Sequence, residues 1–216
     1  MAIIQEYDKC IIKYRLSKLK NDVSITAFFE EYGCINCGDV RELIGELKEL
    51  TPKLIFTNYD FRTHAKEVER SGVDKAPALL INTGNDFRIR FYGLPGGYQM
   101  ESFLEAIEMV GNGKIELQPK TLELLKNIHV PVRIQVFVSQ KCPYCPAVVI
   151  MAHRLALASP YITAEMVEVL ELPDAASHYN IHGVPHVVIN ESHSFEGVLP
   201  EDLYIEEVMK AVGVEV

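Results

Sequence analysis

Several features that mark other classes of protein are missing from this sequence. Its 216 residues include no tryptophan and no glycine-rich loop of the dinucleotide-binding or P-loop type. We therefore expect no built-in nucleotide cofactor. Acidic residues outnumber basic ones. The resulting formal net charge of −9 argues against a nucleic-acid partner, because neutralising phosphates requires a basic face.

Long apolar runs and a secretory leader are missing as well. No stretch approaches the roughly 20 apolar residues that are needed to cross a bilayer. The first residues, Met1-Ala2-Ile3-Ile4, lead directly into charged residues, which is unlike a signal peptide. The hydrophobic fraction of 48% is typical of an ordered, globular chain. We expect a cytoplasmic protein without a membrane partner.

The cysteines that are present form a pattern. Four of the five lie in two Cys-x-x-Cys motifs, Cys34–Cys37 and Cys142–Cys145, whose first cysteines are 108 residues apart. Ala76-Pro77 and Val184-Pro185 repeat at the same separation. Paired cysteines inside the cell are more often redox or metal sites than structural disulfides. The repeat therefore predicts two redox modules in one chain.

The two modules are separated by the breaker cluster Gly111-Asn112-Gly113-Lys114, so we expect domains over residues 1–115 and 116–216. Hydrophobic periodicity predicts the same order of elements in both halves. In the first half these are a helix over 3–20, a strand over 23–29, a helix after Cys37, a strand over 53–59, a helix over 62–70, strands over 78–82 and 87–92 with the hairpin connector Thr83-Gly84-Asn85-Asp86, and a closing helix. In the second half they are a helix near 122–128, a strand over 132–138, a helix ending before Ser159-Pro160, a strand over 161–169, a short helix near 175–179, a strand over 187–190, an edge strand at Phe195 and a closing helix.

This order predicts an α/β fold class with two tandem units. Each unit is expected to contain a central mixed β-sheet flanked by helices, with an extra leading helix. In the first leading helix, Ile4, Tyr7, Ile11 and Tyr14 form an apolar stripe that also contains Cys10. We expect Cys10 to be buried as a small hydrophobic residue, because free cysteines usually pack instead of reacting.

The order strand, Cys-x-x-Cys and helix places the first thiol of each motif at a helix N-terminus. There the free N–H groups and the helix dipole favour the thiolate, which is the form that attacks a disulfide. Cys34 and Cys142 are therefore the predicted attacking thiols, and Cys37 and Cys145 the resolving ones. Pro143 is expected at the start of the second helix, where it removes a competing donor, so the two sites should differ in potential.

These residues resemble the thioredoxin superfamily. Cys142-Pro143-Tyr144-Cys145 is similar to the glutaredoxin motif, and Gly183-Val184-Pro185 resembles the segment that carries the superfamily's cis-proline. Two fused units with intact cysteine pairs resemble the protein disulfide oxidoreductases of hyperthermophilic archaea and bacteria. The resemblance covers nearly the whole chain.

The resemblance implies an enzyme that forms, reduces and isomerises disulfides of client proteins in the cytoplasm. It also implies a flavin-dependent thioredoxin reductase as a partner and no cofactor beyond the redox-active disulfides. Pro77 and Pro185 would follow cis peptide bonds and, with Ala76 and Val184, would bind the substrate backbone beside the attacking thiols.

The chain departs from the thioredoxin pattern at two places. Gly33 and Lys141 stand where thioredoxins have tryptophan before the first cysteine, and Lys141 is a candidate for stabilising the Cys142 thiolate. Phe28 and Val136 replace the buried acid that many thioredoxins carry. Proton transfer from the resolving thiol then requires another group or water. Asp60 and Glu168, which are equivalent positions at the ends of the next strands, are candidates; solvated strand ends are the alternative.

Other interpretations remain. The four paired cysteines could bind zinc, but structural zinc sites usually bring their pairs within about 20 residues of each other, so we expect no metal. An iron–sulfur site shared between chains is another alternative. The histidines are expected in surface or packing roles, although His186 could contact substrate. The functional alternatives are an electron carrier to a peroxidase and a non-catalytic chaperone of the same fold.

Overall fold

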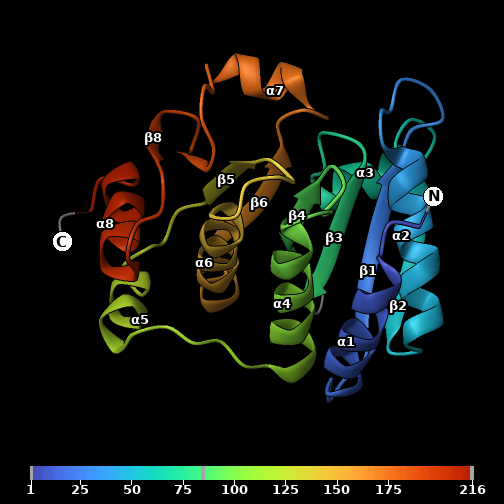
Figure 1. The fold of residues 1–216 in the computed structure, drawn as a ribbon. Coiled ribbons are helices and arrows are strands. Elements are labelled where there is room, and N and C mark those ends of the chain that lie inside the picture. Colours follow the sequence, from blue (N-terminus) through green and yellow to red (C-terminus); the bar gives the residue numbers. More distant parts are fainter. Residues whose placement is uncertain (1, 84–85, 215–216) are drawn as a thin grey trace.

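The computed structural model describes residues 2–83 and 86–214, in which eight strands form a single mixed sheet (Figure 1). The first half contains α1 (Glu6–Ser17), β1 (Val23–Phe29), α2 (Cys37–Leu50), β2 (Leu54–Asp60), α3 (Ala65–Ser71), β3 (Ala78–Thr83), β4 (Asp86–Tyr92) and α4 (Gln99–Asn112). The second half contains α5 (Pro119–Leu125), β5 (Val132–Val138), α6 (Cys145–Ala158), β6 (Ile162–Glu168), α7 (Pro173–His178), β7 (His186–Ile189), β8 (His193–Glu196) and α8 (Glu201–Ala211).

The predicted two-unit α/β organisation is confirmed. In each half the strand before the cysteine motif is internal: β1 pairs parallel with β2 and antiparallel with β3, and β5 pairs parallel with β6 and antiparallel with β7. Both internal strands are mainly apolar and are buried at nearly every position, as expected for strands covered on both faces. The predicted connector Thr83–Asp86 includes residues 84 and 85, which lie outside the described residues.

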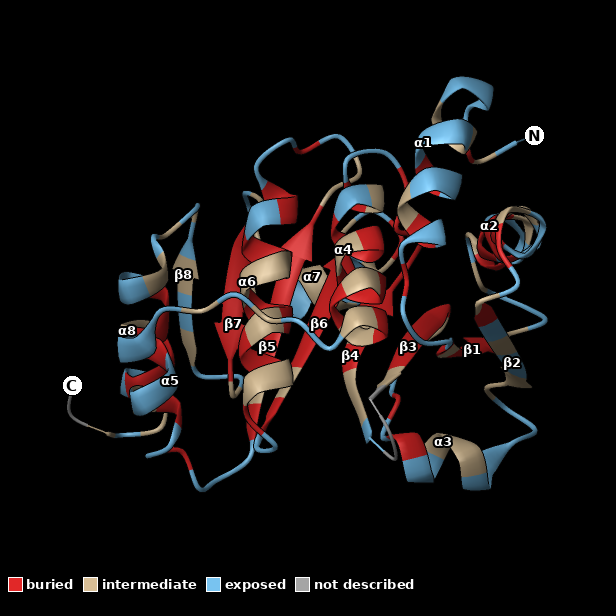
Figure 2. Cartoon of the chain, turned by 90° about the horizontal axis from the view of Figure 1, so that it is seen from below, coloured by how far each residue is buried: buried red, intermediate tan, exposed pale blue. Residues whose placement is uncertain are grey.

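Two helical layers cover the sheet. One face packs against α1, α2, α4, α5, α6 and α8, and the other against α3 and α7. Figure 2 shows the central strands buried and the outer sides of the helices exposed. No helix within the described residues combines the length and the apolar character that crossing a membrane would require.

The sheet continues from one half into the other, which the sequence did not predict. β4 pairs parallel with β6, with Ile89 opposite Ala164 and Tyr92 opposite Val167, and the strand order is β2-β1-β3-β4-β6-β5-β7-β8. Both strands would otherwise be sheet edges with unpaired backbone groups, and pairing satisfies those groups. The boundary at 115/116 lies between α4 and α5 and stays a prediction.

The apolar stripe predicted for the leading helix is wrong. Tyr7, Ile11 and Tyr14 are mostly exposed, whereas Ile12 and Leu16 are buried. Cys10, which was expected to be buried, is exposed as well. The face of α1 that is buried depends on α2 and α4, against which the helix packs, and helical spacing alone does not distinguish two adjacent apolar faces.

A buried histidine on α6 predicts a pH dependence of stability. His153 is fully buried, lies edge-on to Phe91 with ring centroids 4.9 Å apart, and burial lowers its pKa to about 3. In the unfolded chain its pKa is about 6.5. A depressed pKa contributes stability that is present above about pH 6.5 and is lost as pH falls toward 3. Between pH 6 and 4 we therefore expect the free energy of unfolding to fall more steeply for the wild type than for His153→Leu. The difference between the two slopes should be up to about 1.4 kcal/mol per pH unit.

Urea denaturation at pH 6, 5 and 4 measures this slope, with His129→Leu, an exposed position after α5, as the matched control. The control should follow the wild type. Parallel pH profiles for wild type and His153→Leu would contradict the prediction.

Candidate active site

The first cysteine motif lies between the end of β1 and the start of α2. Cys34 is half-buried, Cys37 is the first residue of the helix, and the two form a disulfide. The Glu30 N–H donates a hydrogen bond to Sγ of Cys37 at 3.4 Å. The motif thus places Cys34 beside a helix N-terminus, whose N–H groups favour a thiolate once the disulfide is reduced.

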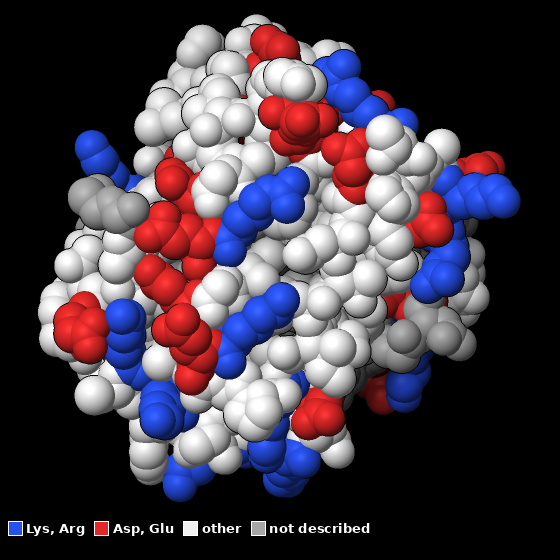
Figure 3. Space-filling view, turned by 90° about the vertical axis from the view of Figure 1, so that its right-hand side faces the viewer, with Lys and Arg blue, Asp and Glu red and all other residues white. Residues whose placement is uncertain are grey.

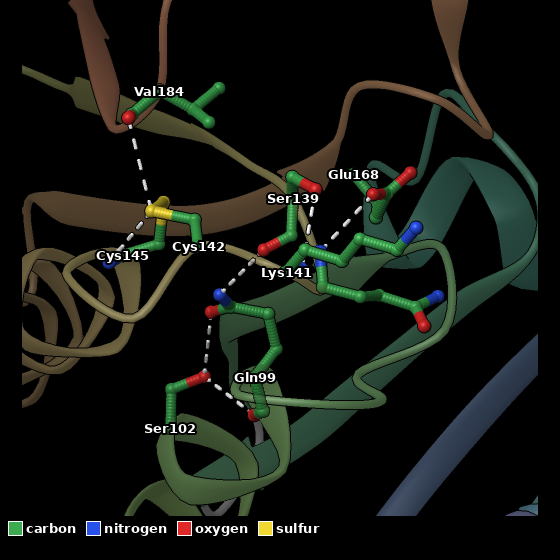
Figure 4. Close-up of a disulfide and its surroundings, with 9 residues drawn as sticks. Gln99, Ser102, Ser139, Lys141, Cys142, Cys145, Glu168 and Val184 are labelled. Atoms are coloured by element: carbon green, nitrogen blue, oxygen red, sulfur yellow. Dashed lines mark hydrogen bonds between the residues drawn. A yellow bond between two sulfur atoms is a disulfide. The ribbon is translucent and has the colours of Figure 1, made fainter.

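The second motif repeats this arrangement between β5 and α6 (Figure 4). Cys142 and Cys145 form a disulfide and are 8% and 0% exposed. The Cys145 N–H donates to Sγ of Cys142 at 3.2 Å. A helix N-terminal N–H therefore points at the sulfur of the predicted attacking cysteine, where it would stabilise a negative charge.

The predicted cis-prolines are present. The peptide bonds Ala76-Pro77 and Val184-Pro185 are both cis. Sγ of Cys142 lies 3.8 Å from the carbonyl oxygen of Val184, so the residue before Pro185 lies beside the attacking sulfur (Figure 4). The roles of these four residues in binding substrate stay predictions.

Asp60 and Glu168, which are equivalent in sequence, have different environments. Asp60 lies at the surface and accepts hydrogen bonds from the N–H and the hydroxyl of Thr63, at 2.8 and 3.0 Å. These bonds hold the pKa of Asp60 below its usual range. Such a carboxylate serves to close the turn after β2, as expected for a solvated strand end.

Glu168 is almost completely buried. It accepts backbone N–H groups of Leu170 and Glu171 at 2.8 and 2.9 Å, and that of Gln140 at 3.4 Å. Because Gln140 stands two residues before Cys142, Glu168 anchors the loop that leads into the second motif. Its role in proton transfer stays a prediction.

The other predicted tuning residues also have defined positions. Lys141 is exposed, and its N–H donates to Oγ of Ser139 at 3.3 Å. The prediction that Pro143 opens the second helix is wrong, because Tyr144 is the N-cap of α6 and Pro146 occupies the first helical turn. A proline is favoured in that turn because its missing N–H would have no helical partner there.

Sequence reasoning missed Glu171. It is only 7% exposed, its Oε2 accepts the Leu94 N–H at 2.9 Å, and its Oε1 accepts Nε2 of Gln140 at 3.0 Å. Burial raises the pKa of Glu171, while these hydrogen bonds oppose the rise. No local signal could have identified it, because Leu94 and Glu171, which the first of these bonds joins, belong to different halves of the chain.

One face of the molecule has mixed charge (Figure 3), and the described residues include no cluster of metal-ligating side chains. On the face shown in Figure 3, acidic and basic side chains are interspersed, with an acidic band on one side. In the parts of the chain that the structure describes, no group of three or more His, Cys, Asp or Glu side chains is placed to hold a metal ion. Each cysteine pair is instead closed on itself as a disulfide.

Comparison with known proteins agrees with this geometry. Residues 132–210 match the family model of the thioredoxin domain. A protein disulfide oxidoreductase from Aeropyrum pernix superposes with a TM-score of 0.89 and 27% identity over 98% of this chain and 95% of the other. The chain is a two-unit thioredoxin-fold redox protein. Its two Cys-x-x-Cys motifs, each closed as a disulfide, fit thiol–disulfide exchange chemistry.

This thioredoxin-fold protein also resembles alkyl hydroperoxide reductases. A structure of the reductase AhpF from Enterococcus faecalis superposes with a TM-score of 0.85 and 23% identity over 94% of this chain and 98% of the other. An alkyl hydroperoxide reductase protein of Escherichia coli is 25% identical over 88% of this chain and 34% of its own length. A protein from Bacillus subtilis named NADH dehydrogenase is 23% identical over 81% and 31%. The chain thus spans about a third of the length of these curated relatives.

Proposed function

We propose that this protein forms, reduces and isomerises disulfides of client proteins by dithiol–disulfide exchange at both motifs. The observation that carries the proposal is that each half presents an intact cysteine pair at the N-terminus of a 14-residue helix. The similarity to a protein disulfide oxidoreductase over nearly the whole chain supports it.

In the reductive direction, the Cys142 thiolate attacks one sulfur of a client disulfide. The client S–S bond breaks, a mixed disulfide forms, and a client thiolate leaves. Cys145, after losing its proton, then attacks Sγ of Cys142, which releases the second client thiol and forms the Cys142–Cys145 disulfide. Two electrons pass to the client, and the reverse sequence oxidises it. Cys34 and Cys37 are proposed to do the same.

Exposed apolar side chains support unfolded protein chains as clients. Tyr32 precedes the first motif, Ile35 lies within it and Tyr144 lies within the second; all three are at least 66% exposed. Such side chains favour contact with apolar segments of a partner. A groove of about 510 Å³, lined in part by Ile35 and Ala76, opens beside the first motif.

A second groove, of about 650 Å³, includes Lys141, the residue before Cys142, and the exposed side of α1 with Tyr7 and Ile11. It provides the second motif with a neighbouring apolar surface. We also propose a cytoplasmic location in a hyperthermophile and a thioredoxin reductase as the source of electrons, as the resemblance implies.

The second candidate is an electron carrier to a peroxidase, which the similarity to alkyl hydroperoxide reductases favours. The exchange chemistry would be the same, but the acceptor would be a disulfide of a single partner protein, the peroxidase, instead of the disulfides of many client proteins.

Insulin reduction and reactivation of scrambled ribonuclease test the proposal on wild type, Cys34→Ser, Cys142→Ser and the double variant. We expect each single variant to lose part of the activity, and the double variant to fall by at least about 100-fold, because serine is a far weaker nucleophile than a thiolate. Full activity of both single variants in both assays would contradict two working sites. If the protein reduced a peroxidase but were inactive in both of these assays, the second candidate would be favoured.

A further inference from the structure

One polar side chain beside the second motif is completely buried, and the exchange reaction described above does not use it. Gln99, the first residue of α4, is 0% exposed and comes from the first half of the chain. Figure 4 shows its side chain directed toward the loop that leads into Cys142. Its Nε2 donates a hydrogen bond to the carbonyl oxygen of Ser139 at 3.2 Å. Because a buried amide costs free energy unless it is hydrogen-bonded, this contact replaces the water that the NH₂ group loses on burial.

The Ser139 carbonyl has a second donor, and that donor is the predicted attacking residue. The Cys142 N–H donates to the same oxygen at 3.1 Å. A carbonyl oxygen has two lone pairs and can accept both bonds. Two hydrogen bonds therefore connect Gln99 to the backbone of Cys142. The placement of that backbone in turn decides whether the sulfur reaches the Cys145 N–H, which lies 3.2 Å from it.

The next residue of this loop, Gln140, is held by other contacts. Its carbonyl oxygen accepts the Tyr98 N–H at 3.0 Å, and its Nε2 donates to Oε1 of Glu171 at 3.0 Å. These contacts fix residue 140, whereas Gln99 is bonded to the carbonyl that Cys142 itself uses. The contact of Gln99 therefore acts closer to the cysteine than these two do.

The two motifs differ in this contact. Gly93 and Gly197 are equivalent positions, since the N–H of each donates to the carbonyl of the cis-proline of its own half, at 3.0 and 2.9 Å. Six residues further along stand Gln99 in the first half and Leu203 in the second. Leu203 is 44% exposed, and its side chain contains no hydrogen-bond donor. The thiol of Cys34 therefore serves as an internal control for an effect of Gln99.

We propose that Gln99 is a positioning residue for the second motif: by holding the Ser139 carbonyl, it keeps the sulfur of Cys142 within reach of the helix N–H. That N–H, which belongs to Cys145, stabilises the thiolate of the reduced site. Without the NH₂ group of Gln99, the carbonyl is free to shift and the N–H···S bond lengthens. A larger share of Cys142 then stays protonated at a given pH. The exchange reaction at the second motif thus depends on a residue from the first half.

Other titratable groups surround Cys142 and must be constant in the test. They are Lys141 and Tyr144 in the motif, Tyr98 before α4, Glu168 and Glu171 at the end of β6 and in the loop after it, His153 on α6, and His182 and His186 on either side of Pro185. Since none of them is altered in the variants below, differences between variants report on Gln99.

The inference rests on the proposed role of Cys142 as an attacking thiol, and it is tested by a reaction that needs no client. The Cys142 thiolate attacks the methylene carbon of iodoacetamide, an S–C bond forms and iodide leaves. The rate against pH gives the pKa of the thiol. The background is Cys10→Ser/Cys34→Ser/Cys37→Ser/Cys145→Ser, which leaves one thiol and keeps the backbone N–H of residue 145. Cys10 is replaced because it is exposed and would react as well.

We expect Gln99→Met to raise the midpoint of this profile by about 0.7 pH units, and to lower the rate about fivefold below the midpoint. This is the size expected when one hydrogen bond to the sulfur is lost. Methionine is unbranched and of similar length, so it fills the same space but has no NH₂ group. Gln99→Leu also lacks this group, should shift the midpoint in the same direction, and decides the question if Gln99→Met does not fold.

Ser102→Ala is the matched control. Its hydroxyl donates to the backbone carbonyl of Gln99 at 2.8 Å and lies 3.5 Å from Oε1, on the other atom of the same amide. The substitution therefore disturbs the start of α4 but leaves the NH₂ group and its bond to Ser139. We expect the midpoint of Cys142 to be unchanged in Ser102→Ala.

The reciprocal background, Cys10→Ser/Cys37→Ser/Cys142→Ser/Cys145→Ser, leaves Cys34 as the single thiol, and its midpoint should not respond to Gln99→Met. The proposal is overturned if the midpoint of Cys142 does not rise, if Ser102→Ala raises it as much, or if Cys34 shifts equally. Full insulin reduction without a shift would reject this role of Gln99 alone. The expected shift in a protein that is inactive toward insulin and scrambled ribonuclease would reject the proposed function but not this role.

Discussion

Gly97→Ala is expected to lower the free energy of unfolding by about 3 kcal/mol, because it combines backbone strain, a steric clash and a lost hydrogen bond. Gly97 has φ +56°, a conformation that favours glycine, and an added Cβ would collide with the backbone carbonyl oxygen of Gln140. That oxygen also accepts the N–H of Tyr98 at 3.0 Å. The substitution therefore separates the loop after β4 from the loop that precedes Cys142.

Two other glycines separate the causes. Gly113 has a similar φ of +63° but open space around it, so Gly113→Ala should cost only the backbone term, about 1 kcal/mol. Gly45 lies in α2 with open space, and Gly45→Ala should be neutral or stabilising by up to about 1 kcal/mol. Urea denaturation provides all three values. Equal losses for Gly97→Ala and Gly113→Ala would show that the contact with Gln140 is unimportant.

Glu165→Leu is expected to have a comparable effect, a loss of about 3 kcal/mol, because it leaves two arginines without their shared buried partner. Glu165 on β6 is fully buried. It accepts hydrogen bonds from Nε and Nη2 of Arg133 at 3.0 and 2.8 Å, and lies 3.3 Å from Nη1 of Arg90 on β4. The cluster thus joins the two halves where their strands pair. The loss should be at the low end for a buried pair, because both arginines keep other acceptors.

The control is Glu123→Gln, which removes an exposed ion pair with Lys126 and should change stability by less than about 0.5 kcal/mol. Replacing Glu165 together with Arg90 and Arg133 by apolar residues should recover much of the loss, since no charge then remains unpaired. A change of less than about 1 kcal/mol for Glu165→Leu alone would contradict the prediction.

Local patterns were enough to predict most of what each half looks like. β1 and β5 begin and end where the apolar runs do, and α2 ends at Leu50 before Thr51-Pro52, as expected. The cis bonds before Pro77 and Pro185 followed from the resemblance and the 108-residue repeat. The leading helix was the exception: its aromatic residues suggested a buried stripe, while packing buried Ile12 and Leu16 instead.

By itself, then, the sequence determined two thioredoxin-like units, each with a cysteine pair at a helix start, because strand and helix periodicity and the placement of proline act over a few neighbouring residues. Only the tertiary structure decided how the units meet: β4 beside β6, Gly97 against Gln140, and Glu171 bonded to the Leu94 N–H. These contacts join non-equivalent positions of the repeat that are far apart in the chain. Complementary shape and burial in the folded protein determine which residues meet in these contacts, and no periodicity in the sequence predicts them.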